Sequence, residues 1–145
     1  MMSVRFKPLL TALLATLIAV PLHAEDRVFK ARNHMTVAEL DNGLIEVGGF
    51  IRNSGLEDYW CAVGDYLYRA KRLPWEQKIY VARGLGPGQV TAHRDAVLFT
   101  LDPAAAGIKP LDKSFRVVGT LTVGRSKQVN SAFYSCRQFP LRDRD

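Results

Sequence analysis

Residues 54 to 72 carry apolar side chains at the spacing of an amphipathic helix, and this stripe constrains the fold more than any other feature. Its members are Leu56, Tyr59, Trp60, Val63, Tyr66, Leu67 and Ala70. Residues three and four positions apart lie on the same side of a helix, so these side chains form one continuous face. Because such a face is unfavourable in water, the rest of the chain must supply a surface that covers it.

Sequence signals mark both ends of this predicted helix. The segment Ser54-Gly55-Leu56-Glu57 fits a capping box, in which the serine and glutamate side chains bind the first free backbone amides. Pro74 prevents the helix from continuing, because proline lacks the amide hydrogen that a helix interior needs. We therefore predict one main helix over about residues 54–72.

The remaining sequence alternates short apolar runs with turn residues, which is typical of an antiparallel sheet. Asp41-Asn42-Gly43 separates the runs 35–40 and 44–51, and Asn-Gly favours the positive φ of a tight hairpin turn. Gly48-Gly49 is expected to mark a bulge. Further strands are predicted at residues 78–82, 96–101, 114–123 and 129–136, with a loop at 84–88. The prediction is an α+β domain with a small, mostly antiparallel sheet packed on one main helix.

The chain has two cysteines, Cys61 and Cys136, and we predict that they form one disulfide. An even number of cysteines in an exported chain is typical of disulfide-bonded proteins. Since successive helical residues are about 100° apart, Cys61 lies on the side of Asp58, Asp65 and Arg72, away from the apolar stripe. We therefore expect Cys136 to attach the C-terminal segment to the outer flank of the helix.

The first 24 residues have the three parts of a cleavable secretory signal peptide. Arg5 and Lys7 supply the positive start, Leu9 to Val20 form an apolar run, and Ala24 is a small residue at the predicted cut. The apolar run is shorter than the roughly 20 residues that a membrane-spanning helix needs. We expect a periplasmic or secreted protein, with residues 25–145 as a single domain and no membrane span after cleavage.

Positive charge and aromatic side chains are concentrated between residues 59 and 94 of a chain whose formal net charge is +6. The basic residues predicted to face a partner are Arg69, Lys71, Arg72, Lys78 and Arg83. Cations beside aromatic rings favour an anionic partner. The alternative is an aromatic core with a solvated basic face. Export of the chain argues against nucleic acid as the partner.

A second interpretation makes Cys61 a nucleophile. A cysteine on a helix, followed by strands and by a histidine at the start of a strand, is similar in order to papain-like and transglutaminase-like cysteine enzymes. The resemblance spans residues 61–102. It implies that the Cys61 thiolate attacks a carbonyl carbon, that His93 moves the proton and that Asp102 orients the imidazole. A disulfide to Cys136 would remove this nucleophile, so the two interpretations exclude each other.

The sequence contains no motif for a metal or a bound cofactor, so we expect neither. The glycines of residues 84–88 lack the Gly-Lys-Ser/Thr ending of a phosphate loop, and His34 and His93 are isolated from other metal ligands. The first functional hypothesis is a non-catalytic binding or accessory domain for an envelope component, either an anionic molecule or another exported protein. The second hypothesis is a cysteine hydrolase or transferase that uses Cys61 and His93.

Overall fold

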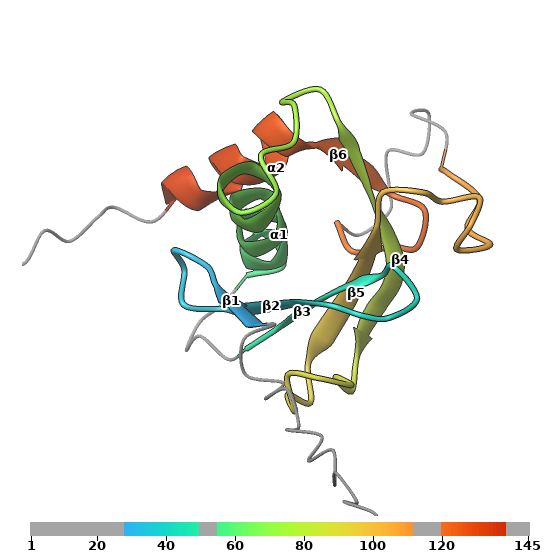
Figure 1. Cartoon of the computed structure of the whole chain (residues 1–145), viewed down its shortest axis with the longest axis horizontal. Coiled ribbons are helices and arrows are strands. Elements are labelled where there is room, and N and C mark those ends of the chain that lie inside the picture. The colour runs from blue at the N-terminus through green and yellow to red at the C-terminus, as the bar shows by residue number, and fades with distance from the viewer. Residues whose placement is uncertain (1–27, 50–54, 112–119, 139–145) are drawn as a thin grey trace, which may run out of the picture.

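The computed structural model describes residues 28–49, 55–111 and 120–138. These residues form a six-stranded sheet with two α-helices and a short 3-10 helix (Figure 1). The strands are β1 (Val28–Lys30), β2 (Thr36–Glu39), β3 (Ile45–Gly48), β4 (Lys78–Gly86), β5 (Ala96–Thr100) and β6 (Ser126–Gln128). The helices are α1 (Glu57–Arg69) and α2 (Val129–Tyr134), followed by the 3-10 helix η2 (Ser135–Gln138). The predicted α+β fold with one main helix is confirmed.

The strands follow the order β1-β2-β3-β5-β4-β6, and each adjacent pair is antiparallel. The predicted hairpin between β2 and β3 is confirmed, with Val37 opposite Val47 and a φ of 78° at Gly43 in the turn. Alternate strand residues point to one face of the sheet. That face joins the apolar stripe of α1 in one buried cluster, in which Trp60 meets Phe99 edge-on at 4.9 Å between ring centroids.

The β-bulge predicted at Gly48-Gly49 is not seen there; the register shifts lie between β4 and β5. The pairing of β2 with β3 is regular up to Gly48. Instead, the register between β4 and β5 shifts between Val81 and Arg83 and again between Arg83 and Gly86. Glycine within a strand often marks such a bulge, and here the strand continues through most of the predicted loop 84–88.

The strand predicted over residues 129–136 is wrong, because these residues form α2 and the start of η2. Val129 and Ala132 are fully buried, which is the three-residue spacing of a short helix. Gly64 lets α2 pack directly on α1, since a Cβ atom at Gly64 would lie 2.5 Å from the backbone nitrogen of Phe133. Most of the strand predicted at 114–123 lies outside the described residues.

Helix α1 is shorter than the predicted 54–72 at both ends. Ser54, and with it the predicted cap, lies outside the described residues. The carboxylate of Asp58 accepts a hydrogen bond of 2.7 Å from the Gly55 amide, whereas Glu57 binds distant parts of the chain. At the other end, the φ of 54° at Arg72 turns the chain out of the helical conformation.

The predicted signal peptide stays a prediction, because residues 1–27 lie outside the described part of the chain. Within the described ranges, no helix has the length and apolar character needed to cross a membrane.

Candidate functional site

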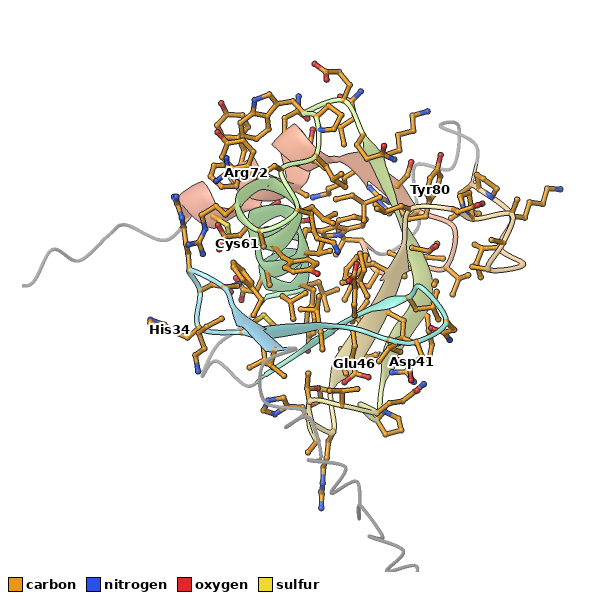
Figure 2. The ribbon with its side chains drawn as sticks, in the orientation of Figure 1. His34, Asp41, Glu46, Cys61, Arg72 and Tyr80 are labelled. Atoms are coloured by element: carbon orange, nitrogen blue, oxygen red, sulfur yellow. A yellow bond between two sulfur atoms is a disulfide. The ribbon has the colours of Figure 1, made fainter. Side chains whose placement is uncertain are left out.

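Cys61 and Cys136 form a disulfide, which confirms the predicted pairing. It links the middle of α1 to η2, and the two Cα atoms are 4.7 Å apart. Cys61 lies within α1 beside the C-terminal helices (Figure 2) and is fully buried. The disulfide therefore attaches the C-terminal segment to the flank of α1, as predicted, although the attached segment is helical.

The structure does not bring together the three residues of the predicted cysteine enzyme. The sulfur of Cys61 is bonded to Cys136, so Cys61 has no thiolate that could act as a nucleophile. His93 precedes β5 and Asp102 follows it, so the two lie beyond opposite ends of this strand. A five-residue strand is about 16 Å long, which is too far for a hydrogen bond between the imidazole and the carboxylate.

Two of the five predicted basic residues are engaged in contacts that hold the fold together. The Lys71 ammonium group pairs with Glu39 of β2 at 2.8 Å. The guanidinium group of Arg83 donates to the carbonyl oxygens of Pro87 and Ala96, at 2.9 and 3.3 Å. These contacts join β2 to the end of α1, and β4 to the start of β5.

The other three predicted basic residues lie on different elements. Lys78 is exposed at the start of β4, and Arg72 is exposed just after α1 (Figure 2). Arg69 lies in the last turn of α1, where it contacts Asp65. Of these five residues, Arg69 is the one whose side chain contacts both the buried Asp65 and the ring of Phe29.

Four aromatic side chains gather where α1, the segment 73–77 and α2 meet. We call Tyr68, Trp75, Phe133 and Tyr134 the aromatic cluster. Tyr68 stacks on Trp75 with ring centroids 4.0 Å apart, and Phe133 meets both rings edge-on at 5.1 and 5.5 Å. Tyr68 is 38% exposed and Tyr134 is 47% exposed. The cluster thus presents aromatic surface to solvent beside the C-terminal end of α1.

Next to the aromatic cluster, the buried Asp65 holds two arginines, Arg32 and Arg69, which we call the arginine pair. Nε of Arg69 donates to Asp65 Oδ1 at 2.6 Å, and Nη2 of Arg69 donates to the other carboxylate oxygen. The backbone amide of Arg32 donates to Asp65 Oδ2 at 2.9 Å, and its Nε lies 3.4 Å from Oδ1. The Asp65 side chain is fully buried, whereas those of Arg32 and Arg69 are 51% and 38% exposed.

Aromatic rings also support the arginine pair. The guanidinium carbon of Arg32 lies 5.1 Å from the ring centroid of Phe133, and that of Arg69 lies 5.0 Å from Phe29. The hydrogen bond to Asp65 raises the pKa of Arg69, so this cation stays charged throughout the physiological range. Because Phe133 of the aromatic cluster contacts Arg32, the arginine pair and the aromatic cluster adjoin, and we call them together the arginine–aromatic face.

A cavity of about 550 Å³ adjoins this face at Phe29. Its lining comprises Val28, Phe29, Glu39, Leu40, Asp41, Tyr66 and Ala70. Glu39 already pairs with Lys71. Burial raises the pKa of Tyr66, so its phenol remains neutral. The cavity therefore lies between β1, the end of β2 and α1, and Phe29 separates it from the Arg69 guanidinium group.

Ser135 and Lys127 lie close together near the start of α1. Their contacts connect separate segments of the chain through Glu57. Ser135 Oγ lies 3.5 Å from Lys127 Nζ, and both groups donate to the Glu57 carboxylate. Burial acts to raise the pKa of Glu57, but hydrogen bonds from Lys127, Thr120 and Ser135 lower it overall. The Glu57 carboxylate therefore joins the start of α1 to Lys127 of β6 and to Ser135 of η2.

Glu46 is a fully buried carboxylate on β3, a position that the local sequence pattern does not indicate. One oxygen accepts hydrogen bonds from the amides of Val90 and Thr91 and from the Thr91 hydroxyl, at 2.8 to 3.1 Å. The other accepts the Gln89 amide at 2.6 Å. Burial acts to raise the pKa of Glu46, but these hydrogen bonds lower it overall. Glu46 therefore holds the β4–β5 loop against the sheet, and Figure 2 shows it beside that loop.

Replacing Glu46 by glutamine should lower the free energy of unfolding by about 2 kcal/mol near neutral pH, because an NH₂ group would replace one of two acceptor oxygens facing backbone amides. The lowered pKa means that the wild-type contribution is complete above the ordinary value of 4.5 and is lost as the pH falls through the folded-state pKa. Urea unfolding at about pH 7 and about pH 3 measures both effects. Exposed Glu76→Gln is the control, and an equal acid sensitivity of Glu46→Gln and wild type would contradict this role.

Comparisons with known proteins add no further constraint. No protein-family model matches the chain, and neither the curated proteins nor the solved structures give a match. Among the described residues, no three His, Cys, Asp or Glu side chains gather as ligands for a metal ion. The functional proposal therefore depends on the chemistry of the arginine–aromatic face.

Proposed function

We propose that the chain is an exported binding domain that holds an anionic component of the cell envelope through its arginine–aromatic face. One observation carries this proposal. The buried Asp65 fixes two half-exposed arginines beside a surface cluster of four aromatic rings.

The residue types on this face are those that dominate binding energies. Tyrosine, tryptophan and arginine are enriched among the residues whose loss weakens protein complexes most. A contiguous patch of exposed aromatic surface is unusual on a soluble domain unless a partner covers it. Because Asp65, Phe133 and the stacked rings already fix the side chains, little conformational entropy would be lost on binding.

The disulfide and the N-terminal pattern support the compartment in this proposal. Disulfides persist in oxidising compartments such as the periplasm or the extracellular space, and the pairing of Cys61 with Cys136 is compatible with either. The charged start, apolar run and small residue of residues 1–24 point to the same route. The disulfide also favours binding over a cysteine-dependent reaction, because it occupies Cys61.

Substituting the two exposed tyrosines tests the binding function. In sedimentation with washed cell envelopes of the source organism, Tyr68→Ala and Tyr134→Ala should each weaken binding about tenfold, as expected for aromatic residues at the centre of an interface. Leu85→Ala is the matched control, because Leu85 is 53% exposed but lies near the far end of β4. Equal sedimentation of all three variants and the wild type would contradict the proposed surface.

A further inference from the structure

We infer that the anionic partner is a carboxylated saccharide, with its carboxylate on the arginine pair and its sugar ring on the aromatic cluster. This inference rests on the proposed binding function and specifies its ligand class.

The arginine pair has N–H donors that Asp65 does not use. A guanidinium group carries five N–H donors, and Asp65 uses the Nε side of Arg69 together with one donor on Nη2. Arg32 reaches Asp65 with Nε and with its backbone amide. Within the described residues, neither the Nη groups of Arg32 nor Nη1 of Arg69 has a hydrogen-bond partner. These terminal nitrogens can form the parallel N–H···O bonds with which arginine recognises a carboxylate.

The geometry brings the two guanidinium groups within reach of one anion. Both Nε atoms approach the same oxygen, Asp65 Oδ1, at 2.6 Å from Arg69 and 3.4 Å from Arg32. Two cations around one buried carboxylate leave a single net positive charge, which matches a monoanion. Because Asp65 is buried and cannot follow the ligand, the pair is fixed in place before binding.

The aromatic cluster suits a sugar ring. The ring planes of Tyr68 and Tyr134 are nearly parallel to that of Trp75, at 22° and 8°. The face of an aromatic ring carries partial negative charge, so it attracts the partially positive C–H groups on one side of a sugar. The most exposed rings of this cluster are tyrosines, whose hydroxyl groups favour a hydrated ligand with hydroxyl groups over lipid tails.

The experiment titrates the protein, expressed as the full chain and purified in its oxidised form, with polygalacturonate, and follows tryptophan fluorescence. Polygalacturonate carries a carboxylate on every sugar, whereas the control polymer dextran is neutral. We expect polygalacturonate to bind at least about tenfold more tightly than dextran. Arg32→Gln should weaken polygalacturonate binding by a similar factor. Arg32→Lys keeps the charge but loses the two parallel N–H donors of the guanidinium group, so its affinity should lie between those of wild type and Arg32→Gln.

Lys109→Gln is the matched control, because it removes the same charge from the exposed connection after β5, on the other side of the molecule from α1 and α2 (Figure 1). Equal weakening by Arg32→Gln and Lys109→Gln would overturn the inference, since binding would then follow net charge alone. Binding to phosphatidylglycerol vesicles without binding to polygalacturonate would also overturn it in favour of a lipid surface. If wild type binds neither polygalacturonate nor the vesicles, the inferred saccharide ligand is wrong. The proposed binding function is tested separately, by envelope sedimentation of Tyr68→Ala and Tyr134→Ala.

Discussion

Replacing Cys136 by serine is expected to lower the free energy of unfolding by about 4 kcal/mol. The disulfide joins residues 75 positions apart, and closing so long a loop removes much of the conformational freedom of the unfolded chain. Helix α2 has six residues, too few to be stable alone, so it also depends on this attachment to α1. Denaturant unfolding of the variant and the wild type, both without reductant, measures the difference.

The same unfolding experiment with a dithiol reductant separates the covalent link from the side-chain change. Reduced wild type should unfold at nearly the same denaturant concentration as Cys136→Ser, and the variant itself should be insensitive to reductant. Ser131→Ala, at an exposed position of α2, is the control for substitutions in this helix. An unchanged midpoint for Cys136→Ser would show that packing alone holds the C-terminal helices.

The substitution Gly64→Ala is expected to lower the free energy of unfolding by about 3 kcal/mol, although alanine is the better helix former by about 1 kcal/mol. A Cβ atom at this position would lie 2.5 Å from the backbone nitrogen of Phe133 and 2.6 Å from the carbonyl carbon of Ala132. Both contacts are with backbone, so α2 would have to move as a whole. Denaturant unfolding of the oxidised variant measures the loss.

Gly55→Ala provides the matched control, because a Cβ atom at Gly55 would meet nothing within 4 Å. We expect this control to leave the free energy of unfolding nearly unchanged. Gly64→Ala should also weaken envelope binding, since α2 carries Phe133 and Tyr134 of the aromatic cluster. A stabilising effect of Gly64→Ala would mean that the two helices do not pack this closely.

The main helix and the first hairpin could be predicted because their signals are local. The apolar stripe of α1 repeats over several turns, and Asn42-Gly43 specifies the turn between β2 and β3 by its own backbone preference. The helical form of residues 129–134 could not be predicted in this way. A run of six residues fits the apolar spacing of a helix and that of a strand equally well. The contacts that favour the helix come from Gly64 and Cys61 on α1, which is distant in the sequence.

The candidate site was predicted only in part for the same reason. The local excess of basic residues indicates Arg69, but Arg32 and Phe133 come from segments far away in the sequence. Helical spacing predicts Asp65 on the polar side of α1, whereas it is fully buried beneath the arginine pair. The spacing of four residues between Asp65 and Arg69 was a usable signal, since opposite charges at that spacing pair on a helix.

Four stretches of the chain meet in the arginine–aromatic face: the connection after β1, the second half of α1, the segment 73–77, and α2 close to the C-terminus. The last of these is fastened by the bond between Cys61 and Cys136. A molecule whose two thiols are still reduced would therefore lack a complete face. We expect ligand capture to begin only after oxidation, so that the redox state of one cysteine pair would control the proposed binding.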